Sequence, residues 1–173
     1  MSNGVRTALL VFVAALLQAS VFSSVVIAGG APDVLLVTLI SIALLRGSVP
    51  GAAAGFAGGL IVDVATLGTL GVNALLLTVA GYWAGRYGET TGRDRLHAPL
   101  LSIVVITLLV GVGAYALYFL LGEDVSARHA LVTTLLPGLG LNLIVGGPIY
   151  GLCRWVLKPA APPIRAQEVE VVV

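Results

Sequence analysis

Charged residues are scarce in this chain, because Asp, Glu, Lys and Arg together make up only 10% of its 173 residues. A soluble domain of this size typically carries about a quarter charged residues. So few charges cannot keep the chain hydrated, which excludes an ordinary soluble domain. The net charge of +1 also gives no sign of nucleic-acid binding.

Residues that commonly carry chemistry are equally few. Cys153 is the single cysteine and lies in an apolar stretch, so the sequence has neither a disulfide framework nor a cysteine metal cluster. His97 and His129 each stand alone in a connecting segment. No G-x-S-x-G elbow, H-E-x-x-H pair or phosphate-cradling loop is present. We therefore predict no enzymatic activity, no metal ion and no cofactor.

The chain is rich instead in long apolar runs, with 58% hydrophobic residues and a mean hydropathy of +1.07. A helix of about 20 residues crosses a hydrocarbon core of about 30 Å. Six apolar segments can be drawn, at about residues 5–27, 33–46, 49–64, 71–86, 98–121 and 131–157. The first is longer than the roughly 7–15 residues of a signal-peptide core, so we expect it to be retained as a span.

These segments predict an all-α polytopic membrane protein, a bundle of about six transmembrane helices. Residues 1–158 would form this single transmembrane domain. The proline-rich residues 159–173 are expected to form a disordered cytoplasmic tail.

The basic residues predict the orientation of the bundle. With the N-terminus in the cytoplasm, the only basic residue on the outer side is Arg128. The cytoplasmic side receives Arg6, Arg46, Arg86, Arg93, Arg95, Arg154, Lys158 and Arg165. This distribution follows the positive-inside bias, so we predict that both termini are cytoplasmic.

The second and third segments are short for full spans. Asp33 and Asp63 bracket them and leave about 15 residues, or about 22 Å, for each leg. Three alternatives remain open: the flanking residues extend the helices, the bilayer thins locally, or residues 33–64 form a re-entrant hairpin with Arg46 reaching back to the surface.

A glycine occurs every fourth residue at Gly47, Gly51, Gly55 and Gly59, and Asp63 continues the series. On a helix this spacing forms a groove of small residues that lets another backbone approach closely. The groove could receive a helix of another protein. We favour a contact between two helices of this chain, because small-residue rows usually serve internal packing.

Two carboxylates mark the ends of helices. Pro32 and Asp33 are typical of a helix start, since proline tolerates the first turn and aspartate accepts bonds from free N–H groups. Asp63 ends the glycine row where the chain must reverse before Asn73. We favour a structural role, in which its carboxylate bonds backbone N–H groups of residues 65–71 or the side chain of Asn73. A direct role in binding a partner or ligand is the alternative.

An ordered series of motifs runs through these segments. Pro32 and Asp33 open the second segment, "GGLIVD" ends at Asp63, and "LGVNAL" follows with Gly71 and Asn73. "AGYWAGR" then closes the fourth segment. In order and spacing, over about residues 5–158, the series resembles the rod shape-determining protein MreD family.

The resemblance implies a non-enzymatic, multi-pass component of the bacterial plasma membrane that supports cell-wall elongation and cell shape. It implies MreC as the direct partner, within a complex that includes MreB filaments, the glycan polymerase RodA and a penicillin-binding transpeptidase. The candidate partner-binding or structural residues are Pro32, Asp33, Gly51, Gly55, Gly59, Asp63, Gly71 and Asn73.

The family's fold is also similar to the substrate-capture subunits of energy-coupling-factor transporters. This likeness defines an alternative function, a small-molecule binding subunit with a pocket open to the outside. The outer connections offer few polar or aromatic residues to hold such a ligand.

Overall fold

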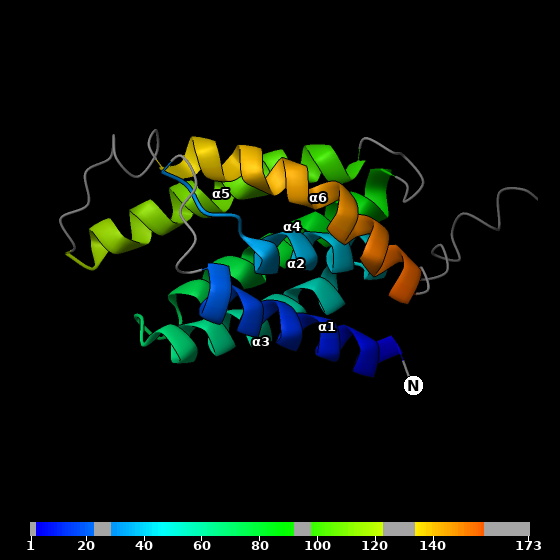
Figure 1. The fold of residues 1–173 in the computed structure, drawn as a ribbon, viewed down its shortest axis with the longest axis horizontal. Helices are drawn as coiled ribbons and strands as arrows, with labels where there is room; N and C mark the ends of the chain where they lie inside the picture. The colour runs from blue at the N-terminus through cyan, green and yellow to red at the C-terminus, as the bar shows by residue number, and fades with distance from the viewer. Residues whose placement is uncertain (1–2, 23–28, 92–97, 123–133, 158–173) are drawn as a thin grey trace, which may run out of the picture.

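The computed structural model describes residues 3–22, 29–91, 98–122 and 134–157 (Figure 1). Within these ranges the regular elements are helices: α1 (Asn3–Leu17), the π-helical turn η1 (Gln18–Phe22), α2 (Val34–Arg46), α3 (Ser48–Thr66), α4 (Val72–Thr91), α5 (Ala98–Leu120) and α6 (Leu136–Val156). The expected tail and some residues used to predict orientation lie outside the described ranges: residues 159–173, Arg93, Arg95, Arg128 and Lys158.

Four of these helices are long and apolar enough to cross a membrane, spanning Asn3–Val21, Ser48–Thr66, Pro99–Leu120 and Leu136–Val156. Helix α2 is a shorter apolar helix of 13 residues, about 20 Å in length. The predicted all-α membrane bundle is therefore confirmed. Its orientation in the membrane stays a prediction.

Successive helices alternate in direction. Arg6 at the start of α1 donates to the carbonyl of Val156 at the end of α6, with an N–O distance of 3.1 Å. Gly51 and Gly59 of α3 lie beside Gly81 and Ala74 of α4, which gives the two helices opposite directions. One end of the bundle thus collects Arg6, Arg46, Arg86 and Arg154 and is called the basic end. The opposite end, with Asp33 and Asp63, is called the acidic end.

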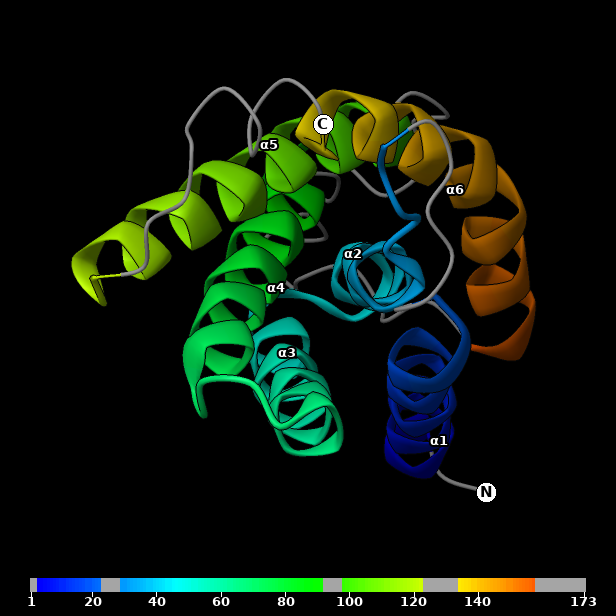
Figure 2. The same ribbon diagram turned by 60° about the vertical axis from the view of Figure 1, so that its left-hand side comes forward.

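Helix α2 occupies the centre of the bundle (Figure 2). All residues from Val34 to Leu45 are buried, on every side of the helix. A helix that is apolar all round belongs in an interior, and α2 packs against α1, α3, α4, α5 and α6. The surrounding helices expose large apolar side chains instead, including Phe12, Phe56, Phe119, Ile144 and Trp155. This surface suits lipid rather than water.

The boundaries of α2 follow from its flanking residues. The Asp33 carboxylate accepts the Leu36 N–H at 2.8 Å and caps the helix, as the sequence predicts. Pro32 precedes the cap and so lies outside the first turn, because the helix begins at Val34. At the other end, Gly47 has a φ of 102° and joins α2 directly to α3. This backbone conformation favours glycine.

Helix α4 is longer than the apolar pattern indicates. The sequence predicts a segment ending near residue 86, whereas the helix continues to Thr91. The extra residues 87–91 include Glu89, Thr90 and Thr91, so they are more polar than the segment before them. An apolar pattern marks only the part of a helix that lies in lipid or in the core, so it misses this extension.

Candidate functional site

The carboxylate of Asp63 lies at the acidic end and caps a helix other than its own. Asp63 is only 1% exposed and sits near the end of α3. One oxygen accepts the Gly71 N–H at 2.8 Å and the Ala74 N–H at 3.3 Å. The other accepts the Asn73 side-chain amide at 2.8 Å and the Asn73 N–H at 3.3 Å. The predicted bonds to the turn and to Asn73 are both present.

These bonds satisfy the free N–H groups at the first turn of α4. Asp63 therefore does for α4 what an N-cap residue does within its own helix, and its charge faces the positive end of the helix dipole. A carboxylate offers about four lone-pair sites, and four donors occupy them here. The carboxylate therefore has no free lone pair with which to accept a hydrogen bond from a partner or ligand.

The glycine row of α3 packs against the backbone of α4. A Cβ added at Gly51 would lie 2.5 Å from the carbonyl oxygen of Gly81. A Cβ at Gly59 would lie 2.5 Å from the Cα of Ala74, and one at Gly55 would overlap the backbone of Leu77. Helix α4 thus fills this groove from within the chain, in agreement with the favoured interpretation. The face that these glycines present is closed to another protein's helix.

The opposing surface on α4 also consists of small residues. Gly81 and Gly85 meet Gly51 and Ser48, with equally little room for a side chain. The sequence interpretation missed this role, although a small residue at each of two positions four apart was visible in "AGYWAGR". Gly47, the first member of the row, lies between α2 and α3 and belongs to the junction instead.

A second polar cluster joins four helical elements at the start of α2. The Asp33 N–H donates to the side-chain oxygen of Asn142 in α6 at 2.7 Å. The Asn142 amide donates to the hydroxyl of Thr107 in α5 at 3.3 Å. The Val34 N–H donates to the side-chain oxygen of Gln18 in η1 at 2.9 Å. These bonds tie η1, α5 and α6 to the beginning of the central helix.

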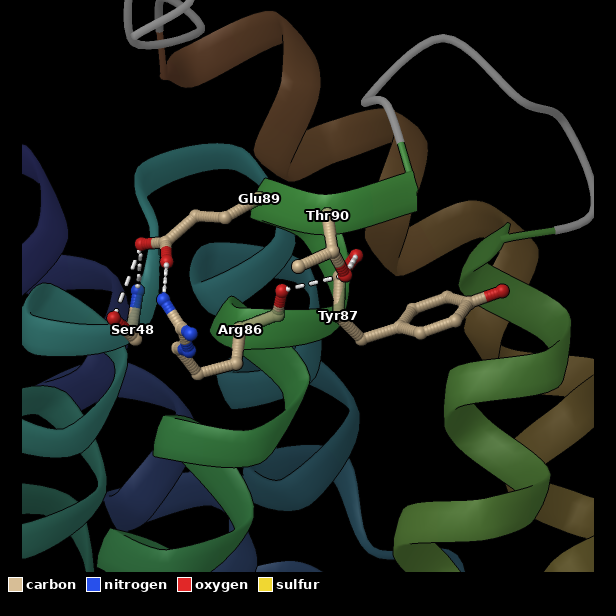
Figure 3. Close-up of polar contacts among 5 residues, drawn as sticks. All are labelled: Ser48, Arg86, Tyr87, Glu89 and Thr90. Atoms are coloured by element: carbon tan, nitrogen blue, oxygen red, sulfur yellow. Dashed lines mark hydrogen bonds and ion pairs between the residues drawn. The ribbon is translucent and has the colours of Figure 1, made fainter.

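The basic end has its own cap, shown in Figure 3. The Glu89 carboxylate accepts the Ser48 N–H at 2.8 Å and the Ser48 hydroxyl at 3.0 Å, so it caps the start of α3 from the end of α4. Arg86 forms an ion pair with Glu89 at 3.4 Å. The backbone bond from Ser48, followed by the Ser48 hydroxyl and Arg86, lowers the pKa of Glu89 despite some desolvation.

Helices α3 and α4 therefore cap each other reciprocally. Asp63 of α3 caps the start of α4, and Glu89 of α4 caps the start of α3. The glycine contact lies between these caps. The bonds of both caps are internal to this pair of helices. Within the described residues, no group of three or more His, Cys, Asp or Glu side chains could hold a metal ion.

Comparison with known proteins places this architecture in a family. No curated protein and no solved structure matches the chain. A match to the family described as rod shape-determining protein MreD covers residues 2–158, which includes every helix described above. The chain therefore belongs to the rod shape-determining protein MreD family.

Proposed function

We propose that this chain is a non-enzymatic scaffold of the bacterial plasma membrane that supports cell-wall elongation by binding MreC. Membership of the MreD family supports a role in rod shape determination. MreB, RodA and a penicillin-binding transpeptidase are the proposed members of the wider complex.

The observation that carries the proposal is the burial of α2 along its whole length. A transporter or a substrate-capture subunit keeps polar groups around an interior site. Here the axis of the bundle is occupied by aliphatic side chains such as Leu36, Leu39 and Ile40, each at most 2% exposed. Ser41, a polar residue of this helix, donates its hydroxyl to the Val37 carbonyl within the same helix. A packed axis favours a protein that acts through its outer surface.

The alternative, a small-molecule capture subunit, has weaker support. The buried Asp63 carboxylate would be the obvious group to recognise a ligand, but its acceptors are bonded to α4 and Asn73. The Asn142 side chain is likewise engaged by Asp33 and Thr107.

The experiment that tests the proposal is co-purification of the full chain with MreC from membranes in mild detergent. We expect a stoichiometric complex, and an unrelated single-span membrane protein expressed at the same level serves as the control. Native mass spectrometry of the same preparation reports any small ligand. A bound metabolite together with no retention of MreC would refute the scaffold proposal and favour the capture subunit.

A further inference from the structure

Helices α4 and α5 enclose an apolar groove of about 430 Å³ on the surface of the bundle. Its floor consists of Ala84, Ser102 and Ile106, each at most 5% exposed. Its walls are formed by more exposed apolar and aromatic side chains: Trp83, Tyr87, Leu101, Val105 and Leu109. In Figure 3 the Tyr87 ring projects to the side opposite Glu89 and Ser48, so this groove is separate from the cap at the start of α3.

The floor of the groove contains an unsatisfied hydroxyl. Among the described residues, the Ser102 Oγ is the buried side-chain polar atom that has no hydrogen-bond partner. Other hydroxyls in this chain bond the carbonyl four residues earlier, at Thr7, Ser41, Thr66, Thr78 and Thr90. A buried hydroxyl without a partner is costly, so an unsatisfied one in a folded protein calls for an explanation.

The level of Ser102 in the bundle indicates what could satisfy it. Ser102 lies about one turn from the start of α5, and Tyr87 lies about one turn from the end of α4, both at the basic end. Trp and Tyr side chains gather where lipid headgroups meet the hydrocarbon. The ester carbonyls of glycerolipids lie at this same level and can accept a hydrogen bond but not donate one.

The size of the groove favours a chain thinner than a helix. The groove follows α5 from Leu101 to Leu109. The floor residues Ala84, Ser102 and Ile106 are each at most 5% exposed, so the groove is narrow at its base. An extended acyl chain is narrow enough to enter such a groove, whereas a helix about 10 Å in diameter rests on the more exposed walls.

We propose that this groove binds a diacyl glycerolipid. One acyl chain lies between α4 and α5 and runs from Ser102 toward Leu109. The Ser102 hydroxyl, which is buried in the floor, rotates toward the groove and donates a hydrogen bond to the ester carbonyl at the head of this chain, beside Tyr87.

The test is lipid binding by the full-length protein, measured by native mass spectrometry during titration with dioleoyl phosphatidylglycerol and with its diether analogue. The ether lipid has the same headgroup and chain length but lacks the ester carbonyls. A single hydrogen bond corresponds to about a fivefold change in affinity. We expect the wild-type protein to bind the diester about fivefold more tightly than the diether. Ser102→Ala should bind both lipids with the weaker affinity.

A second pair of variants tests the groove itself. Val105→Trp fills the groove and should reduce binding of both lipids by about tenfold or more. Val13→Trp changes the same residue type at a similarly exposed site on α1, outside the groove, with Val105 at 53% and Val13 at 46%, and should leave binding unchanged.

Three outcomes would overturn the proposal. The first is equal binding of diester and diether by the wild type. The second is equal binding by the two tryptophan variants, judged only if both elute as monodisperse protein. The third is a photo-crosslinker at position 105 that captures another protein's helix rather than lipid in native membranes. If Val105→Trp does not fold, the comparison of Ser102→Ala with the two lipids still decides the question.

Discussion

At the scale of single residues, two carboxylates each accept hydrogen bonds from backbone N–H groups at the start of a neighbouring helix. Asp63 accepts bonds from Gly71, Asn73 and Ala74, and each of its oxygens serves two donors. A substitution that keeps one oxygen can therefore keep one pair of these bonds, whereas a substitution that removes both oxygens loses all four.

Replacement of Asp63 by alanine should destabilise the protein by about 1–3 kcal/mol, because buried donors at the start of α4 lose their partners. Asp63→Asn should be intermediate, since its oxygen keeps one pair of bonds while its amide nitrogen faces two N–H donors. Thermal unfolding in detergent and abundance in membranes measure both effects, and MreC pull-down should fall in parallel. Equal loss of MreC binding by the two variants at normal abundance would instead indicate recognition of the charge by a partner.

The lowered pKa of Glu89 predicts a dependence of stability on pH. The charged form is stabilised in the folded protein, so its contribution is present above the unfolded pKa of about 4.3 and is lost as the pH falls through the lower folded pKa. The melting temperature of the wild type should decrease over this range, and that of Glu89→Gln should decrease less. The effect should be small because Glu89 is exposed. Identical pH profiles for the two proteins would rule out this contribution.

The residue-level interpretation of the sequence was most successful where the partner lay nearby in the chain. The bonds of Asp63 to Gly71 and Asn73 and the cap at Asp33 were predicted, since position next to a turn or helix start suffices to infer them. The contacts of Asn142 with Asp33 and Thr107 were not predicted. They connect residues 109 and 35 positions apart, and nothing in the local pattern identifies such a partner.

At the scale of elements, α3 and α4 form the tightest contact in the bundle. Lipid provides no hydrophobic drive for helices to associate, so close backbone packing must supply much of the attraction. The glycine spacing in α3 predicted such a contact but not the helix that makes it. The identification of α4 required the three-dimensional structure, because several segments of this chain contain small residues at suitable spacing.

Gly55→Ala tests this contact. The new methyl group would overlap the backbone of Leu77, so α3 and α4 must move apart, at a cost of about 1–3 kcal/mol. Gly147→Ala is the matched control, because a Cβ at Gly147 in α6 meets no atom within 4 Å. It should be neutral or slightly stabilising, since alanine favours a helix more than glycine does. Similar melting temperatures for the two variants would contradict the role of Gly55 in close packing.

At the scale of the whole molecule, α3 continues beyond the carboxylate that brackets its apolar segment in the sequence. The helix runs for 19 residues from Ser48 to Thr66, or about 28 Å, close to the roughly 30 Å of hydrocarbon. The turn after it exposes Leu67 by 92% and Leu70 by 69%. Several of its N–H groups are bonded within the chain, including those of Leu67, Gly68 and Val72. Backbone N–H groups that contact lipid must be bonded within the protein, because the hydrocarbon offers no acceptor. Of the sequence alternatives, extension by flanking residues describes α3, and the exposed leucines of the turn after it suit contact with lipid.

We therefore expect cysteines at positions 67 and 70 to react slowly with a membrane-impermeant maleimide in lipid nanodiscs. A cysteine at position 121, just beyond the longer helix α5, should react rapidly. The native Cys153 is buried and is replaced by alanine in all three variants. Detergent should remove the difference, because it replaces the lipid. Rapid labelling at positions 67 and 70 in nanodiscs would place the turn in water.

The central position of α2 also has a consequence for how the chain is made. Ribosomes add about 5–20 residues per second, so about 5–20 s separate the emergence of α2 from that of the last helix. During this interval the Ser41 hydroxyl can already bond Val37, and the Val34 N–H can bond Gln18 of the earlier η1. The Asp33 N–H must wait for Asn142. Arrival of α6 at the translocon thus completes the enclosure of α2, and nascent chains that end before it leave this helix open to lipid along the side that α6 will cover.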